Sequence, residues 1–493
     1  MSRAKCIMVQ GTMSGAGKSL LCAALCRIFA QDGYRTAPFK SQNMALNSFV
    51  TQEGLEIGRA QAVQAQAAGI APDVRMNPIL LKPSSDTGSQ VIVHGEVRGQ
   101  MPAAEYYRYK KRLIPEVLAA YESLAAEYDV IVIEGAGSPA EINLRTDDIV
   151  NMGLALRVNA PVLLAGDIDR GGVFAQLYGT AALLEPEERK QIAGLIINKF
   201  RGDLEILRPG LSMLEEKTGK PVLGVIPYLQ VDVDDEDSLA PRLGRTEAHK
   251  PLDAAVIRLP RISNFTDFAP LEAHPQIGVR YVDGARQLGC PDLIILPGTK
   301  STIDDLLWLR QCGLEAAVQK AAAAGTPVLG VCGGYQMLGT MLHDPEGVEG
   351  PAGKSVRGMG LLPAETAFTA RKRRTQTTAT VVAEELAGAE LEGYEIHMGR
   401  TEASGAAFCT LSDGRSDGCV QGNVWGTYLH GLFDSGQLAG RLAALLCARK
   451  GLQPETAETL SHAAYQQQQF DLLADGVRKA LDLGEIYRIM EEA

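Results

Sequence analysis

A glycine-rich stretch near the start of the chain limits the possible folds more than any other. The apolar run from Lys5 to Gln10 predicts a strand, and the sequence GTMSGAGKS follows it directly. From Ser19 onward, apolar residues recur at helical spacing. This spacing predicts a helix that ends at Gly33. A strand, a glycine-rich loop ending in Gly-Lys-Ser and a helix form a phosphate-binding loop, because the N–H groups of such a loop can surround phosphate oxygens. The stretch therefore predicts nucleotide binding.

The residues of this loop that we expect to bind ATP are Gly11, Thr12, Gly15, Gly17, Lys18 and Ser19. Lys18 supplies positive charge to the phosphates, and the hydroxyl of Ser19 is expected to bind Mg²⁺. The usual motif has a glycine at the position of Thr12, whereas this chain has its glycine one residue earlier. This longer loop resembles that of the dethiobiotin synthetase branch of P-loop proteins.

Five further apolar runs predict the other strands of one parallel sheet. They are Thr36–Phe39, Val130–Ile133, Val162–Ala165, Leu195–Ile197 and Val222–Ile226. Helix-length segments separate most of them, which is typical of a doubly wound α/β domain. Ligands bind beyond the carboxyl ends of such strands, so we expect Glu134, which ends the run VIVIE, to bind Mg²⁺. Asp167 and Asp169 are expected near the γ-phosphate or the metal, and Asn198 near the nucleotide base.

A second stretch, from Thr326 to Gly339, reads TPVLGVCGGYQMLG and predicts a nucleophile on a sharp turn. An apolar strand runs into Cys332, and two glycines and a segment of helical character follow. This layout holds a side chain at the carboxyl end of a strand, where the following helix N-terminus favours a thiolate. The alternative is a buried structural cysteine, because most free cysteines are of that kind. We interpret Cys332 as a candidate nucleophile.

Two more strand ends supply partners for this thiol. The strand-like run VWGTYL leads into His430, and a cysteine and a histidine at two strand ends can form a nucleophilic pair. Another apolar run, DLIILP, leads into Gly298. We expect the N–H groups of Gly298 and Gly333 to form an oxyanion hole. Cys332 and His430 are then the expected catalytic residues.

The motifs GVCGGYQ and YLHG resemble those of the class I glutamine amidotransferase domain, and the resemblance covers residues 251–445. It implies hydrolysis of glutamine through a cysteinyl thioester, with release of ammonia. The family usually has a glutamate two residues after the histidine, and here that position is Leu432. The group that orients the histidine is therefore absent or comes from elsewhere. Glu395 and His397 are candidates, because they share one face of a strand-like segment.

Polar loops in the N-terminal half predict a site for a large ligand. The stretch KSQNMALNS directly follows a predicted strand, and MNPILLKP is a second loop punctuated by polar residues. Amide and hydroxyl side chains suit a ligand that bears carboxylates and amides, although a surface loop can carry them as well. The candidate substrate-binding residues are Lys40, Gln42, Asn43, Asn47 and Lys82.

Six stretches match one family in the same order along nearly the whole chain. They are PFKSQNMALNS, GRAQAVQAQAAG, MNPILLKP, EGAGSPAEINL, GDIDRGGVFA and RLPRISNFTDF. They resemble the glutamine-hydrolysing cobyric acid synthases, amidotransferases of the cobalamin pathway. The resemblance implies ATP-dependent amidation of four corrin carboxylates (b, d, e and g), which converts adenosylcobyrinic acid a,c-diamide to adenosylcobyric acid. The alternatives are a cobyrinic acid a,c-diamide synthase and a P-loop regulatory ATPase with an inactive amidotransferase-like module.

We therefore expect two α/β domains, each a mainly parallel sheet flanked by helices. A P-loop synthetase domain would cover residues 1–230, and an amidotransferase domain residues 251–445. The acidic and polar stretch 231–250 would link them, because charge runs are usually solvated. Residues 446–493 would form a helical tail.

Composition narrows the class of protein further. The 493 residues carry a formal net charge of −11, which argues against a general nucleic-acid binder. The nine cysteines have no metal-ligand spacing, which fits a reducing compartment. Nothing resembles a signal peptide, and no apolar run is long enough to cross a bilayer. We expect a cytoplasmic enzyme whose partners are a corrinoid, glutamine and ATP with Mg²⁺, without nucleic acid or membrane; the sequence carries no indication of oligomeric state.

Overall fold

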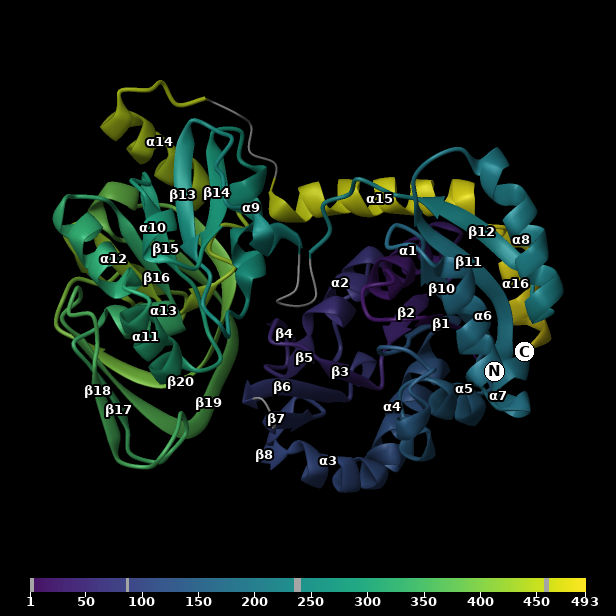
Figure 1. Ribbon diagram of the computed structural model, residues 1–493. Helices are drawn as coiled ribbons and strands as arrows, with labels where there is room; N and C mark the ends of the chain where they lie inside the picture. Colours follow the sequence, from purple (N-terminus) through teal and green to yellow (C-terminus); the bar gives the residue numbers. More distant parts are fainter. Residues whose placement is uncertain (1–3, 86–87, 235–240, 456–460) are drawn as a thin grey trace. The chain divides into compact units, whose positions relative to one another are not determined.

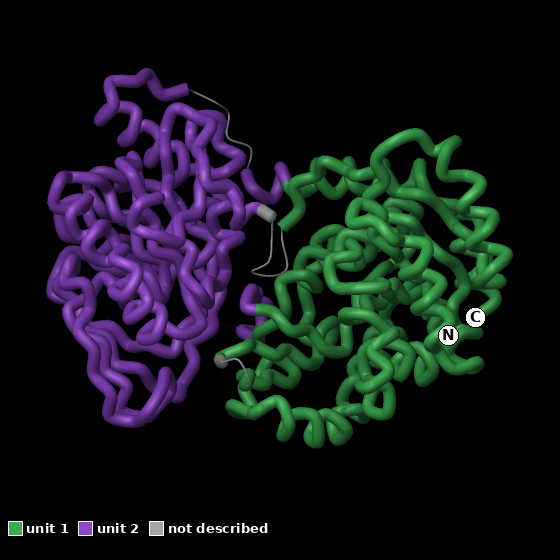
Figure 2. The backbone as a smooth tube through the Cα atoms, viewed as in Figure 1, with its two compact units in different colours: residues 1–45, 56–234, 466–493 green, residues 46–55, 235–465 purple. Residues whose placement is uncertain are grey.

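The computed structural model of the chain describes residues 4–85, 88–234, 241–455 and 461–493 (Figure 1). The chain divides into two compact units (Figure 2). Unit 1 contains residues 1–45, 56–234 and 466–493, and unit 2 contains residues 46–55 and 235–465. Each unit is built on a mainly parallel sheet, which confirms the expected α/β fold.

The two units differ from the predicted domains because two segments change sides. The sequence places residues 46–55 in the first domain, but they pack in unit 2, where Val50 is fully buried in a cluster with Tyr394. The sequence also leaves residues 446–493 as a separate tail. Residues 466–493 instead complete the core of unit 1, because their helices have an apolar side that requires burial.

The predicted linker is only partly a linker. Asp234 belongs to unit 1, where its carboxylate lies 2.6 Å from the guanidinium of Arg59 and also accepts a hydrogen bond from Gln466. This ion pair ties the start of the acidic run to the first unit. The remainder of that run, within residues 235–240, lies outside the described residues.

The main sheet of unit 1 is entirely parallel and confirms the six predicted strands. Its strand order is β12-β11-β10-β1-β9-β2. The strands are β1 (Lys5–Gly11), β2 (Thr36–Phe39), β9 (Val130–Glu134), β10 (Val162–Asp167), β11 (Ile192–Phe200) and β12 (Val222–Pro227). Because β1 lies between β9 and β10, the loop after β1 shares one edge of the sheet with the last residues of both neighbours.

Helices from both ends of the chain cover one face of this sheet. α1 (Lys18–Gln31), α2 (Arg59–Ala67), α15 (His462–Ala480) and α16 (Leu483–Glu492) share one apolar core with side chains of β1 such as Ile7 and Val9. Cys22 and Cys26 of α1 lie fully buried in this core, as their spacing predicts. Burial raises the pKa of both thiols, so they are structural.

The remaining parts of unit 1 surround this sheet. The helices are α3 (Ala103–Tyr109), α4 (Ile114–Glu127), α5 (Met152–Val158), α6 (Val173–Leu183), α7 (Pro186–Gln191) and α8 (Leu204–Thr218). A smaller sheet has the order β3-β6-β7-β8. Its strands are β3 (Gln42–Met44), β6 (Ile79–Ser85), β7 (Gly88–Val93) and β8 (Glu96–Pro102).

The main sheet of unit 2 has the order β14-β13-β15-β16-β24-β23, and only the edge strand β23 is antiparallel to its neighbour. The strands are β13 (Leu252–Ile257), β14 (Ile277–Val282), β15 (Leu293–Leu296), β16 (Val328–Val331), β23 (Cys419–Gln421) and β24 (Val424–Thr427). The helices of this unit are α9 (Ala269–Ala273), α10 (Ala285–Leu288), α11 (Thr302–Gln311), α12 (Leu314–Ala323), α13 (Gly333–Leu338) and α14 (Gln437–Lys450).

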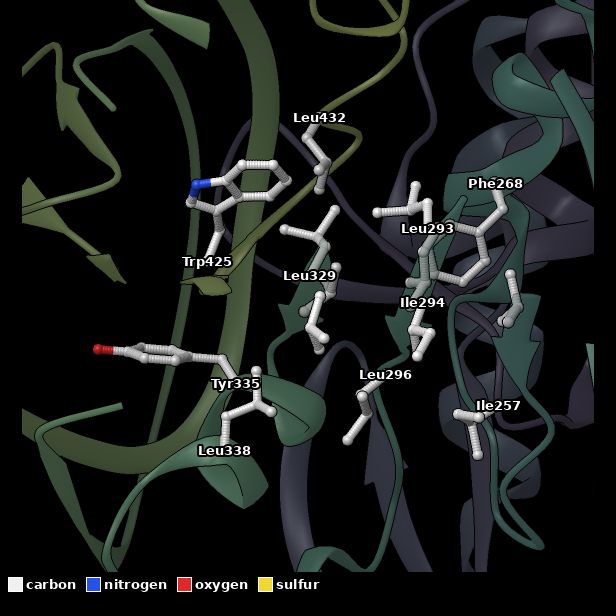
Figure 3. Close-up of a cluster of buried hydrophobic side chains, with 14 of the residues drawn as sticks. Ile257, Phe268, Leu293, Ile294, Leu296, Leu329, Tyr335, Leu338, Trp425 and Leu432 are labelled. Atoms are coloured by element: carbon white, nitrogen blue, oxygen red, sulfur yellow. The ribbon is translucent and has the colours of Figure 1, made fainter. Parts of the chain in front are cut away.

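A second sheet in unit 2 contains the long hairpin of β19 (Ala364–Val381) and β20 (Glu390–Ala403). After β24, the chain enters this second sheet as β25 (Leu429–His430), which pairs with β20. Side chains of β15 and β16 belong to the same buried apolar cluster as Trp425 of β24 (Figure 3). The core therefore fixes the strand ends that carry the predicted amidotransferase residues.

Among the residues that the structure describes, no helix combines the length and the apolar character that a bilayer span requires.

Candidate active site

Cys332 sits on a sharp turn between a strand and a helix, as its sequence context predicts. β16 ends immediately before it, and α13 begins immediately after it. Cys332 has φ 52° and ψ −107°, a conformation that residues other than glycine rarely adopt. Its N–H donates a 2.8 Å hydrogen bond to the carbonyl of Thr427, and a Cβ at Gly334 would collide with the carbonyl of Leu296. The turn is thus held from two sides, with the thiol at the carboxyl edge of the sheet.

His430 ends β25, where the chain has left the main sheet of unit 2 for the second one. Its side chain is buried, and its Nδ1 atom lies 2.6 Å from Oδ2 of Asp267. Burial lowers the pKa of His430, but the carboxylate of Asp267 and the sulfur of Cys332 outweigh burial and raise the pKa to about 10. The ring is therefore poised to carry a proton beside Cys332.

Asp267 supplies the orienting carboxylate that the sequence leaves open. It lies in a 3₁₀ turn, η5 (Phe265–Phe268), beyond the end of β13, and it is 5% exposed. One carboxylate oxygen meets the ring of His430, and the other accepts a 3.1 Å hydrogen bond from the N–H of Gly431. Asp267 is thus bonded to both the side chain and the following peptide. The orienting group comes from elsewhere in the chain, 163 residues before the histidine.

Leu432 occupies the position of the usual class I glutamate, and the fold explains the exchange. Its side chain is fully buried in the core cluster of unit 2, near Leu329 and Leu293 (Figure 3). A carboxylate at this position would lose its hydration among apolar side chains without a partner. The fold therefore favours an apolar residue at position 432, and Asp267 of η5 supplies the carboxylate that bonds His430.

Glu395 and His397 do not orient His430, contrary to one of the sequence-based hypotheses. Glu395 lies 2.8 Å from Arg415 and 3.0 Å from Arg373. Although burial raises its pKa, hydrogen bonds from His397 and Arg415 and the charges of both arginines lower the pKa of Glu395 to about 2. The Nδ1 atom of His397 bonds to a backbone carbonyl at 2.7 Å. Both side chains are thus engaged within β20 and its neighbours.

The two glycines of the predicted oxyanion hole lie beside this group. A Cβ on Gly298 would lie 3.3 Å from Cε1 of His430, and a Cβ on Gly333 would lie 3.1 Å from the amide nitrogen of Thr299. The loop after β15 and the turn after β16 therefore approach each other closely at the catalytic pair. Their role as oxyanion donors stays a prediction.

In unit 1, the loop after β1 has the left-handed glycines that a phosphate-binding loop needs. Gly15 has φ 77° and Gly17 has φ 90°, and Gly17 directly precedes α1. The Nζ atom of Lys18 donates 3.1 Å hydrogen bonds to the carbonyls of Met13 and Gly137. The lysine therefore lies across the loop that should receive the phosphates.

Glu134, at the end of β9, is the centre of a buried polar network. Its carboxylate accepts hydrogen bonds from Ser19 at 2.9 Å, Lys40 at 2.8 Å and the side-chain amides of Gln61 and Gln64. The two glutamines are three residues apart on α2 and therefore share one face. Sequence reasoning missed them, although the repeated glutamines of GRAQAVQAQAAG carried the signal.

This network suits the Mg²⁺ ion that accompanies a bound nucleotide. Ser19 and Glu134 offer hydroxyl and carboxylate oxygens in direct contact, which are the ligand types that Mg²⁺ prefers. Among the described residues, no cluster of three or more His, Cys, Asp or Glu side chains forms a separate metal site. One or two protein oxygens are typical for Mg²⁺ that also binds phosphates.

Asn198, the predicted base contact, touches the phosphate-binding loop itself. Its amide donates a 2.9 Å hydrogen bond to the carbonyl of Ala16. Lys199 has φ 61° and bonds both the carbonyl of Gly15, at 2.6 Å, and Asp167, at 2.9 Å. The end of β11 thus supports the loop. Asp169 instead forms an ion pair on the surface, and the contact between Asn198 and the base stays a prediction.

The structure brings only some of the candidate substrate residues together. Lys40 and Asn43 join the network around Glu134, Asn43 through a 3.2 Å hydrogen bond to Gln61. Gln42 accepts a hydrogen bond from the hydroxyl of Tyr106, and Lys82 forms a buried 2.6 Å ion pair with Glu56. Asn47 falls in the segment that belongs to unit 2.

Comparisons with known proteins agree with both sites. Residues 7–238 match the CobQ/CobB/MinD/ParA nucleotide binding domain, and residues 253–438 match the CobB/CobQ-like glutamine amidotransferase domain. The fold and the two matches together define the class of protein, a glutamine amidotransferase joined to a nucleotide-dependent ligase.

Relatives similar over their full length identify the family within this class. A cobyric acid synthase of Lachnoclostridium phytofermentans is 55% identical over 516 residues, with 99% of each chain covered. The cobyric acid synthase of Ruminiclostridium cellulolyticum is 56% identical, and that of Yersinia enterocolitica is 52% identical, each over 99% of this chain and 98% of the relative. The chain belongs to the cobyric acid synthase family. The alternative of a regulatory ATPase is not favoured by any of these relatives.

Proposed function

We propose that the chain transfers the amide nitrogen of glutamine to carboxylates of a corrinoid, with hydrolysis of ATP. One observation carries the proposal: a single chain contains both catalytic arrays. Cys332 lies on a strained turn beside the buried pair of His430 and Asp267, and Ser19 of the phosphate-binding loop meets the buried Glu134. A thiol array of this kind produces ammonia, and a phosphate-binding loop activates an acceptor.

The corrinoid acceptor follows from the relatives. All those quoted above are named cobyric acid synthases and cover the chain from end to end. The substrate is accordingly adenosylcobyrinic acid a,c-diamide, and amidation of its b, d, e and g carboxylates gives adenosylcobyric acid. Lys40 bonds Glu134, and Asn43 bonds Gln61 in the same network, which supports a role for these side chains in binding such carboxylates or amides.

In unit 2, the thiolate of Cys332 attacks the side-chain amide carbon of glutamine. The N–H groups of Gly298 and Gly333 stabilise the negative oxygen of the tetrahedral intermediate. The Nε2 atom of His430 gives its proton to the leaving nitrogen, which departs as ammonia and leaves a thioester on the sulfur. Water then attacks the thioester while His430 accepts a proton, and glutamate and the free thiol are released. Asp267 holds the ring in one orientation throughout.

In unit 1, an oxygen of the corrin carboxylate attacks the γ-phosphorus of ATP. The bond between the γ-phosphorus and the bridging oxygen breaks, and ADP leaves with an acyl phosphate as the product. Lys18 and the N–H groups of the loop neutralise charge on the transferring group, since such reactions depend mainly on positioning and electrostatics. The oxygens of Ser19 and Glu134 would hold Mg²⁺, which would supply further positive charge at the phosphates. Ammonia then attacks the acyl carbon, and phosphate leaves.

Mass spectrometry of the corrinoid tests this function. The purified chain is incubated with ATP, glutamine and adenosylcobyrinic acid a,c-diamide, and in parallel with cobyrinic acid itself. We expect four successive replacements of hydroxyl by amino groups on the a,c-diamide. Amidation of the a and c carboxylates of cobyrinic acid, without further reaction on the diamide, would contradict the proposal.

A further inference from the structure

Residues 46–55 come from the N-terminal half of the chain but belong to unit 2. Within this segment, β4 (Ser48–Val50) places Val50 in a small apolar cluster with Tyr394 and Ile396 of β20. The ring of Phe49 packs against Tyr394 with centroids 5.7 Å apart. The segment is therefore seated on the strand that runs beside His430.

Ser48 touches both structures that hold the catalytic histidine. Its N–H donates a 3.2 Å hydrogen bond to the side-chain oxygen of Asn264, which begins the turn that carries Asp267. Its carbonyl accepts a 3.4 Å hydrogen bond from the hydroxyl of Tyr394. The ring of Tyr394 in turn stacks on the ring of His430 with centroids 5.3 Å apart and planes 18° apart.

The contacts of Ser48 therefore converge on the triad from two directions. Tyr394 lies directly opposite His430 in the pairing of β20 with β25, so its ring limits tilting of the imidazole. Asn264 has φ 51° and accepts, through its carbonyl, a 3.0 Å hydrogen bond from the N–H of Asp267. A displacement of Ser48 would loosen the stack and the turn together.

Both ends of the segment continue into unit 1. Upstream, β3 leads back to Lys40, which lies 2.8 Å from Glu134 in the network beside the phosphate-binding loop. Downstream, Glu56 forms a buried 2.6 Å ion pair with Lys82. A ligand that changes the ion pair of Lys40 therefore acts on the chain before residues 46–55. A ligand that changes the ion pair of Lys82 acts on Glu56, which directly follows them.

We propose that residues 46–55 are a positioning element of the amidotransferase triad, through which ligand binding in unit 1 raises the rate of glutamine hydrolysis in unit 2. The inference rests on the proposed function and adds a coupling device to it. Phosphate and acceptor binding restrain the chain at Lys40 and Glu56, which stabilises the contacts of Ser48 and the productive orientation of His430. Ammonia is then made chiefly when an acceptor is present. Coupling of two sites through a segment of this kind has a size of roughly 5- to 150-fold.

Three substitutions break the proposed coupling at different atoms. Tyr394→Phe keeps the stacked ring and removes the hydroxyl that bonds Ser48. Asn264→Gly removes the side-chain acceptor, and glycine readily adopts the φ of 51°. Gln376→Leu removes the 2.8 Å hydrogen bond to the carbonyl of Val50, from a residue opposite Tyr394 in the pairing of β19 with β20. The matched control is Tyr281→Phe, which removes another buried tyrosine hydroxyl of unit 2, bonded to Glu272 at 3.2 Å.

The measurement is the rate of glutamine hydrolysis with and without saturating ATP and adenosylcobyrinic acid a,c-diamide. We expect these ligands to raise the wild-type and Tyr281→Phe rates about tenfold. In the three coupling variants this ratio should fall toward one, while amidation with added ammonium salt keeps its wild-type rate. A merely structural role would lower the rates with and without ligands equally and would leave the ratio unchanged.

Each outcome bears on one of the two proposals. A wild-type ratio in all folded coupling variants would overturn the inference, and so would a wild-type enzyme whose glutamine hydrolysis ignores the ligands. Neither result would touch the proposed function, which fails only if the wild-type chain amidates no corrinoid. Because Gln376 bonds the segment at Val50 and bonds neither Ser48 nor the turn of Asp267, its variant keeps the inference testable if the other two do not fold.

Discussion

The phosphate-binding loop and the amidotransferase triad of this chain are built in opposite ways. The first is one continuous stretch, from Gly11 to Ser19, whose glycines and lysine lie side by side in the sequence. The second collects Asp267, Cys332 and His430 from three strand ends spread across the whole of unit 2. A continuous motif encodes its own geometry, whereas a dispersed site depends on sheet order to bring its members together. Substitutions should therefore separate the chemistry of the two sites.

The largest expected effect is the separation of the two sites by Cys332→Ala. Glutamine-dependent amidation should be lost completely, because no other group can form the thioester. Amidation with ammonium salt should continue at the wild-type rate, since the thiol has no part in forming the acyl phosphate. Both rates are measured by mass spectrometry of the corrinoid, and circular dichroism serves as the control for folding. Equal loss of both activities in a folded variant would show that the sites are not separate.

Asp267→Asn tests whether the dispersed site works as a triad. Loss of the equivalent carboxylate in a serine protease lowers turnover by about 10⁴, and we expect an effect of that order on glutamine hydrolysis. Because Asp267 helps to raise the pKa of His430 to about 10, its removal should move the alkaline limb of the pH–rate profile to lower pH. The profile of kcat/KM for glutamine against pH measures both effects. If the alkaline limb does not shift and the rate stays near normal, Cys332 and His430 act as a dyad without Asp267.

Lys18→Ala tests the continuous site. Removing one preorganised positive charge from a transition state typically costs roughly 10² to 10³ in rate. Amidation should fall by about that factor with glutamine and with ammonium salt alike, because both need the acyl phosphate. Glutamine hydrolysis measured without ATP should stay at its wild-type value. Normal amidation by this variant would show that Lys18 of the phosphate-binding loop has no role in the reaction.

Glu395→Gln is the matched control for Asp267→Asn and should have the smallest effect on activity. Glu395 does not contact His430, so glutamine hydrolysis should stay within about tenfold of the wild type. The variant should be less stable, because Arg373 and Arg415 lose their shared partner.

The pH dependence of stability checks the role of Glu395 separately. The pKa of Glu395 is lowered from 4.5 to about 2, so the carboxylate stabilises the fold above pH 4.5, and this contribution disappears as the pH falls through about 2. The difference in Tm between the wild type and Glu395→Gln should shrink over this range. A difference that is constant with pH would mean that charge is not what Glu395 contributes.

Much of the fold and of the first site could be predicted because their signals are local. The six strands of the main sheet of unit 1 are short apolar runs, and helix-length segments separate most of them. The phosphate-binding motif from Gly11 to Ser19 consists of consecutive residues and can be read directly from the sequence. The turn at Cys332 was also predictable, since a strand, a cysteine and two glycines are adjacent.

The remainder depends on contacts between distant residues, which leave no local pattern. Nothing in the sequence around Asp267 distinguishes it from other acidic residues in turns. Its contact with His430 depends on the strand order β14-β13-β15-β16-β24, which brings the end of β13 to the same edge of the sheet as Cys332. The path of residues 46–55 is equally hard to predict, because its hydrogen bonds to unit 2 use backbone atoms of Ser48 and Val50, whose bonding does not depend on side-chain identity.

The last helices of the chain have a consequence for how the protein is made. Ile486, Ile489 and Met490 of α16 share one buried core with Ile7 of β1, so segments far apart in the chain lie together. During synthesis, all of unit 2 is made before residues 466–493, whereas unit 1 is incomplete until these residues have been made. Until then, the part of its apolar core that α15 and α16 cover stays exposed and is able to bind chaperones. Unit 2 should therefore be the first to reach its native fold, although most of unit 1 precedes it in the chain.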